Sequence, residues 1–114
     1  MTWKTVLLLG AVVGTAIGCH GDEATAPEGT AASVDVLDYA FSPDSVTIPV
    51  GARVFWEWKG KAVHNVVFDE NPTQLRSAGK ITGSYHRNFP EPGVYTYYCE
   101  FHGREVMSGV VVVE

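Results

Sequence analysis

Short runs of alternating apolar and polar residues fill most of the chain after residue 33. In one of them Val46, Ile48 and Val50 alternate with threonine and proline. Alternation with a period of two places the apolar residues on one face of a β-strand. Turn signals, such as the Pro-Glu-Pro-Gly segment at 90–93, separate the runs. Many short strands joined by turns predict an all-β sandwich or barrel.

A single domain over residues 34–114 accommodates these strands. They are expected over residues 34–38, 46–50, 54–58, 63–68, 84–89, 94–99 and 110–113. Trp56 and Trp58 fall on one face of their strand, so we expect them in the core. Residues 71–80 are polar and fit either a loop or a short helix.

Residues 1–18 have the features of a signal peptide. Lys4 supplies a positive charge, and an apolar stretch from Val6 to Ile17 follows it. That stretch is too short for a membrane-spanning helix, which needs about 20 apolar residues. The segment ends at Cys19 and resembles a bacterial lipoprotein signal, in which this cysteine carries lipid and becomes the mature N-terminus. The alternative is an ordinary signal cleaved nearby, which leaves Cys19 as a free thiol.

Residues 19–33 connect this segment to the domain. After Cys19 they include no aromatic and no large aliphatic residue, so they cannot bury enough apolar surface to fold. We expect a flexible linker here. Cys19 and Cys99 are the only cysteines, and a disulfide between them would tie the tail to the domain. Lipid on Cys19 and a metal on Cys99 account for both residues instead.

Four potential metal ligands stand out, namely His64, Cys99, His102 and Met107. The last three lie on one short stretch, with two residues between the cysteine and the histidine and four before the methionine. Soft sulfur ligands together with imidazole select copper among the first-row metals. A His₂Cys site with a weak axial methionine is the blue-copper electron-transfer centre. The sequence therefore predicts one copper ion that alternates between Cu(I) and Cu(II), although each residue taken singly also fits a packing role.

The domain resembles the plastocyanin/amicyanin-like cupredoxins, and the resemblance extends beyond the ligand loop. The segments that carry it are Phe41-Ser42-Pro43, Val46-Thr47-Ile48, the run from His64 to Asp69 and the run from Pro92 to Cys99. The resemblance implies a Greek-key sandwich of about eight strands with copper at one end. It also implies that the Asn65 amide ties the first-ligand strand to the cysteine loop. In the family the imidazole at the position of His102 is the exit for the electron, within an apolar patch.

The surroundings of His102 suggest what kind of partner it meets. Phe101 and Gly103 are expected to form an apolar rim, while Arg104 and Glu105 place charge beside it. The whole chain carries a net charge of −5. This acidic balance argues against nucleic acid as a partner and favours a protein with a basic docking surface.

These observations favour a monomeric blue-copper electron carrier. We expect it outside the cytoplasmic membrane, in the periplasm or at the cell surface, anchored by lipid at Cys19 and exchanging single electrons with redox proteins. The alternative is a copper-binding or storage module without a redox partner. The complete ligand set argues against a sandwich that has lost its metal. No enzymatic activity is expected, because multicopper oxidases need further histidine-rich sites and a binuclear centre needs two cysteines in its loop.

Overall fold

Eight strands make up the domain in the computed structural model, which describes residue 26 and residues 29–114. The predicted signal peptide, Cys19 and most of the predicted linker lie outside the described residues. The strands are β1 (Thr30–Leu37), β2 (Ala40–Ser42), β3 (Ser45–Ile48), β4 (Arg53–Trp58), β5 (Val67–Phe68), β6 (Ser84–Asn88), β7 (Gly93–Tyr98) and β8 (Ser108–Val113).

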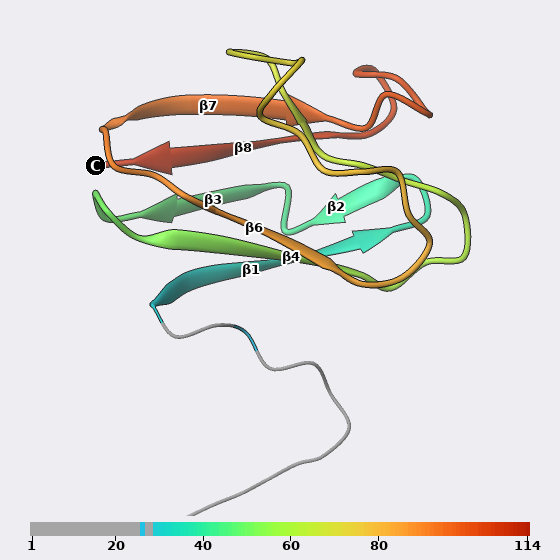
Figure 1. The fold of residues 1–114 in the computed structure, drawn as a ribbon, viewed down its shortest axis with the longest axis horizontal. Helices are drawn as coiled ribbons and strands as arrows, with labels where there is room; N and C mark the ends of the chain where they lie inside the picture. The colour runs from blue at the N-terminus through green and yellow to red at the C-terminus, as the bar shows by residue number, and fades with distance from the viewer. Residues whose placement is uncertain (1–25, 27–28) are drawn as a thin grey trace, which may run out of the picture.

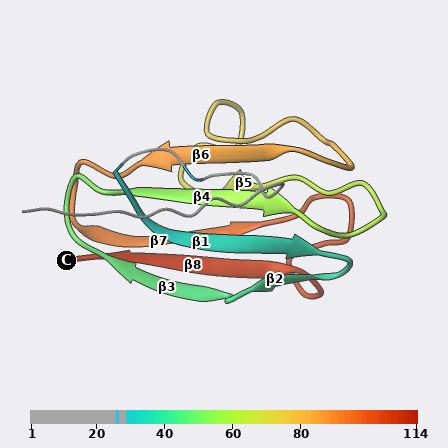
Figure 2. The same ribbon diagram turned by 90° about the horizontal axis from the view of Figure 1, so that it is seen from below.

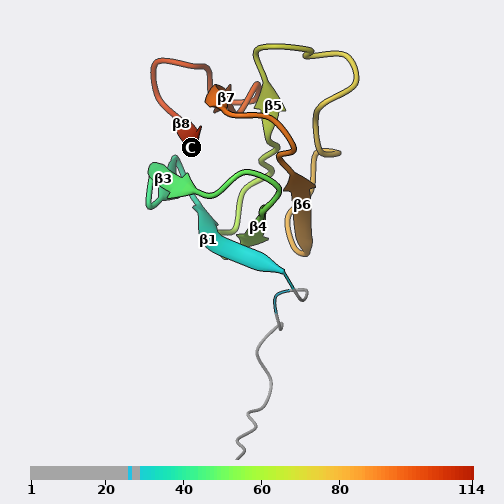
Figure 3. The same ribbon diagram turned by 90° about the vertical axis from the view of Figure 1, so that its left-hand side faces the viewer.

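Two four-stranded sheets pack face to face, with the strand orders β2-β1-β4-β6 and β3-β8-β7-β5. Figures 1 and 3 show the two layers from the side and from one end. Each sheet is mixed, because β1 pairs parallel with β4 and β3 pairs parallel with β8, while the other pairs are antiparallel. The predicted all-β sandwich is confirmed.

The core lies between the sheets and is rich in aromatic rings. Trp56 of β4 is fully buried, and its ring meets those of Phe68 and Tyr97 edge-on at centroid distances of 5.8 and 5.4 Å. Aromatic pairs prefer such edge-to-face geometry. Trp58 is also buried, as the alternating pattern predicts. This rigid core supports the loops at the end of the sandwich opposite the C-terminus, where the β1–β2 turn and the β7–β8 loop lie together (Figures 1 and 2).

The first strand begins earlier than the sequence predicts. We expected residues 30–33 in the linker, but β1 starts at Thr30, so that expectation is wrong. Thr30 and Ser33 lie opposite Arg53 and Phe55 of the parallel strand β4. Backbone pairing, rather than burial of large side chains, holds this segment in the sheet, and hydropathy alone does not reveal such pairing.

The segment before β5 also differs from expectation. A strand over residues 63–68 was predicted, but only Val67 and Phe68 form β5, while His64 makes an isolated bridge with Lys80. Residues 71–80 contain no helix. A single turn, with the Leu75 N–H bonded to the Asn71 carbonyl at 2.8 Å, gives way to chain that folds back along 64–67. Within the part of the chain that the structure describes, no helix is long and apolar enough to cross a membrane.

Candidate metal centre

The loop from Cys99 to Met107 carries three of the four predicted ligands. It joins the end of β7 to the start of β8 and is closed by backbone hydrogen bonds. The Cys99 N–H donates to the Met107 carbonyl at 3.0 Å, and the Met107 N–H donates to the Gly103 carbonyl at 2.9 Å. Gly103 has a φ of +90°, a conformation that residues other than glycine rarely adopt. The two sulfur-bearing residues are thus held at the two ends of one tight loop.

His64 and His102 both turn a ring nitrogen toward the thiol of Cys99. The Cys99 Sγ lies 3.9 Å from His64 Nδ1 and 3.5 Å from His102 Nδ1. The ligand atoms of the three residues all lie within 4.8 Å of one another. Cys99 and His64 are fully buried, whereas His102 is half-buried. A buried thiol faced by two imidazole nitrogens is a donor set that fits copper.

Met107 is part of the hydrophobic core at the end of the ligand loop. Its side chain is fully buried, and its backbone pairs with Cys99 as described above. His86 is exposed on β6, outside this cluster.

Asn65 links the segment of His64 to the loop of Cys99. Its side chain is fully buried, its Nδ2 donates to Glu100 Oε2 at 2.8 Å, and its Oδ1 accepts from the Glu100 N–H at 3.0 Å. Arg76 also pairs with the Glu100 carboxylate. The hydrogen bond from Arg76, and then that from Asn65, lower the pKa of Glu100 below its ordinary value. One side chain therefore fixes two distant segments of the site relative to each other.

Asp38 is a functional residue that sequence reasoning missed. It follows β1, and its Oδ1 lies 2.9 Å from Nε2 of His64. The backbone N–H of Ala62, followed by the ring of His64, holds the pKa of Asp38 at about 2, well below its usual range. Because an ionised carboxylate only accepts hydrogen bonds, this contact favours the neutral His64 tautomer with its proton on Nε2, which leaves the lone pair of Nδ1 on the side of Cys99.

Tyr39, the next residue, packs against the other imidazole. Its ring meets that of His102 edge-on at a centroid distance of 4.8 Å. The backbone of Tyr39 has a φ of +71°, which is rare outside glycine and redirects the chain between β1 and β2. As a result, two consecutive residues contact the two histidines of the cluster.

The surface around His102 is apolar, and most nearby charges are paired. Tyr39, Phe101 and Val106 are 56%, 49% and 58% exposed. Arg104, expected to place charge beside this rim, pairs with Asp69, and its guanidinium lies 4.1 Å from the centre of the Tyr98 ring. The Thr96 hydroxyl and then Arg104 lower the pKa of Asp69. The rim thus carries less unbalanced charge than the sequence suggests.

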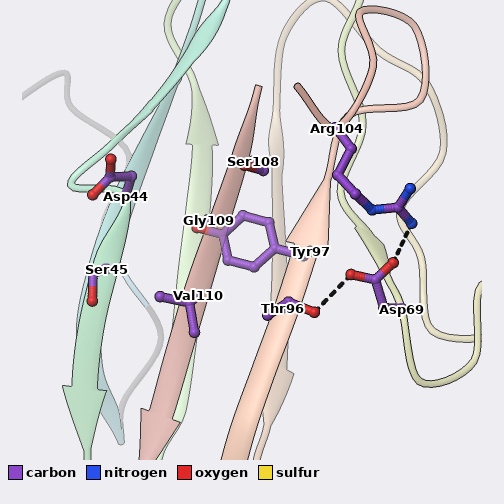
Figure 4. A pocket seen from close by; sticks show the side chains of 9 residues that line it. All are labelled: Asp44, Ser45, Asp69, Thr96, Tyr97, Arg104, Ser108, Gly109 and Val110. Atoms are coloured by element: carbon purple, nitrogen blue, oxygen red, sulfur yellow. Dashed lines mark hydrogen bonds and ion pairs between the residues drawn. The ribbon is translucent and has the colours of Figure 1, made fainter. Parts of the chain in front are cut away.

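A pocket of about 480 Å³ lies elsewhere, against β3, β7 and β8. Figure 4 shows Asp69 at one side of it, bonded to Thr96 and Arg104, and the ring of Tyr97 beside Gly109. A Cβ on Gly109 would lie 3.0 Å from Tyr97 Cε1, so the glycine makes room for this ring. Burial raises the pKa of Tyr97 to about 12. The pocket contains none of the predicted ligands.

Comparison with known proteins places this arrangement in a family. The family model described as copper binding proteins of the plastocyanin/azurin family matches residues 29–114. The chain belongs to this family. The predicted copper cofactor is confirmed at this level, and His64, Cys99 and His102 are positioned as in a type 1 copper site.

Relatives agree with the assignment. A plastocyanin of Scenedesmus fuscus is 33% identical over 84 residues, which cover 65% of this chain and 86% of the relative. A halocyanin of Natronomonas pharaonis is 31% identical over 80 residues, which cover 67% of this chain and 49% of the relative, so the chain spans about half of the halocyanin's length. The structure of an amicyanin variant in its reduced Cu(I) form has a TM-score of 0.66 and 28% identity, covering 79% of this chain and 86% of that one.

Proposed function

We propose that this cupredoxin transfers single electrons between redox proteins through one copper ion held by His64, Cys99, His102 and Met107. The observation that carries the proposal is the buried cluster in which two Nδ1 atoms face the Cys99 sulfur at 3.9 and 3.5 Å. Copper supplies the one-electron change between Cu(I) and Cu(II). Membership in a copper-binding family supports the same reading.

The chain's own residues are suited to a site that rearranges little. His64 is fixed by a backbone bridge to Lys80, with both N–H···O distances at 3.0 Å, and Cys99 is fixed by its backbone bond to Met107. A donor set held by the sandwich keeps its geometry when the oxidation state changes, which favours rapid electron exchange. Met107 would supply a weaker sulfur ligand and would tune the reduction potential of the bound copper.

His102 is the proposed exit for the electron. It is half-buried, whereas the other three proposed ligands are fully buried. The exposed apolar residues around it offer a partner a surface that is easily desolvated. A copper storage module needs the ligands but has no use for such an exit, and this difference favours electron transfer over storage.

The proposed location follows from the N-terminal segment. We propose that lipid on Cys19 tethers the domain outside the cytoplasmic membrane, through the linker that precedes β1. The apolar stretch that ends at Cys19 supports this assignment. The variant Cys19→Ala should keep the copper spectrum and leave the membrane fraction. Recovery of this variant with membranes at the wild-type level after a high-salt wash would contradict the tether.

The decisive test of the site is the visible spectrum of the purified, copper-loaded and oxidised protein. We expect an intense thiolate-to-copper band, and Cys99→Ser should lose it because a hydroxyl is a hard ligand at neutral pH. His86→Gln serves as the control, since it alters an exposed histidine outside the site. A blue Cys99→Ser variant would refute the ligand assignment. Reversible one-electron reduction and fast self-exchange would then separate electron transfer from storage.

A further inference from the structure

The two imidazoles of the cluster have different partners on their outer sides. Nε2 of His64 lies 2.9 Å from Oδ1 of Asp38, whose side chain is 34% exposed while that of His64 is fully buried. Among residues 29–114, His102 has no carboxylate partner, and its ring lies against Tyr39 instead. A carboxylate that accepts a hydrogen bond from a metal-bound imidazole fixes the ring and makes it a stronger donor.

Asp38 is itself held in place by the chain beyond β4. Its Oδ1 accepts the N–H groups of Lys61 and Ala62, each at 2.9 Å, and its Oδ2 lies 3.1 Å from the Lys61 nitrogen. Gly60 packs directly against it, since a Cβ on Gly60 would lie 2.7 Å from the Asp38 nitrogen. The carboxylate is therefore built into the β4–β5 connection and cannot swing freely toward solvent.

We propose that Asp38 is a positioning residue for the metal centre, which locks His64 with its proton on Nε2 and places a negative charge behind the ligand that favours Cu(II) over Cu(I). This inference rests on the proposed function, because it assigns a role at the same site. The hydrogen bond orients Nδ1 toward Cys99, while the charge acts through the ring on the metal. The two contributions can be separated, since a neutral amide can keep the bond without the charge.

The variant Asp38→Asn removes the charge and keeps the acceptor. All three donors reach Oδ1, so an asparagine oxygen in that place retains the bonds to His64, Lys61 and Ala62. We expect its reduction potential to rise, by about 59 mV for each tenfold loss of affinity that falls on Cu(II) alone. Asp35→Asn is the matched control, because it removes the same charge from an exposed position on β1.

The variant Asp38→Ala removes both charge and bond. We expect its Cu(II) dissociation constant to rise by roughly 10–100-fold, as is usual when a partner of a ligating imidazole is lost. Nitrogen NMR of the metal-free protein reports the His64 tautomer without any copper. Wild type and Asp38→Asn should show the proton on Nε2, and Asp38→Ala should show a mixture of tautomers.

The outcomes distinguish this inference from the proposed function. If the wild type is blue, and Asp38→Asn and Asp35→Asn shift the reduction potential by the same amount, the charge effect of Asp38 is overturned. Electron transfer as the proposed function is then unaffected. A proton on Nδ1 of His64 in the metal-free wild type would overturn the positioning role, whatever the protein binds. If the copper-loaded wild type is not blue but His64 carries its proton on Nε2, the proposed function and the charge effect are both refuted. The hydrogen bond by which Asp38 orients His64 would then still be supported.

Discussion

The two sides of the metal centre are built in different ways. His64 is fully buried, and both its backbone and its ring are hydrogen-bonded. Its backbone is bridged to Lys80, its carbonyl accepts a hydrogen bond from Trp58 Nε1 at 3.0 Å, and its ring contacts Asp38. His102 is half-buried on a loop, and its N–H reaches only the Cys99 carbonyl, at 3.4 Å. One proposed ligand is therefore fixed by the scaffold, and the other is placed where a partner protein can reach it. Rigidity and contact with a partner are thus assigned to different halves of one site.

Removing each imidazole in turn should have the largest effect, and it tests whether the two histidines differ in their access to solvent. His64→Gly and His102→Gly should both lose the blue colour. Added imidazole should restore colour in the His102 variant, because that gap opens to solvent, whereas the gap left by His64 is enclosed by the core. We expect the imidazole concentration for half-restoration to differ by at least tenfold, or about 1.4 kcal/mol. An absorbance titration measures this, and equal restoration would contradict the difference in access.

Stability of the metal-free protein tests the link between the two sides. Asn65→Ala leaves the Glu100 N–H without its partner and should cost roughly 1–3 kcal/mol of unfolding free energy, as loss of a buried hydrogen-bond partner does. Arg76→Gln, which touches the same Glu100 from the exposed side, should cost only about 0–1 kcal/mol. Urea unfolding curves give both values. Equal losses would show that the two segments are not coupled through Asn65.

Met107 offers a change that should leave both imidazoles where they are. Met107→Gln should lower the reduction potential, because a harder oxygen ligand favours Cu(II). Met107→Leu keeps an apolar side chain of similar volume without a donor, so it should raise the potential. A shift of about 59 mV in either direction corresponds to a tenfold change in preference between the oxidation states. If voltammetry gives the wild-type potential for both variants, Met107 serves only in packing.

Much of the site was predictable because its ligands are close in sequence. Cys99, His102 and Met107 belong to one loop, so their spacing alone indicates a metal site. Alternating residues likewise predict the two-layer sandwich, because the pattern reports which face of a strand is buried. What the pattern does not report is backbone pairing, and for this reason the start of β1 and the bridge at His64 were missed.

Asp38 was missed for a different reason. It lies 26 positions before His64 in sequence, and only the β1–β2 turn and the β4–β5 connection bring the two together. In sequence it is a carboxylate close to the end of a strand, which is equally true of Asp44 just before β3. Likewise, nothing in the sequence shows that Arg104 and Asp69 neutralise each other. Contacts between distant loops depend on the whole fold rather than on local pattern.

The smallest expected effect concerns charge at the exposed side of the site. The Arg104–Asp69 and Arg76–Glu100 pairs each carry no net charge, which in the described part of the chain leaves two carboxylates near the site without a Lys or Arg partner: Glu105, exposed on the ligand loop, and Asp38, next to Tyr39. We expect the rate of electron transfer to a partner with a basic surface to fall modestly as salt rises, since screening acts over ~10 Å at 0.1 M. Glu105→Gln should weaken this dependence. Arg104→Gln should strengthen it by releasing the charge of Asp69, with little change in potential for either variant. Stopped-flow rates that are flat with salt for all three proteins would mean that docking rests on the apolar surface of Tyr39, Phe101 and Val106 alone.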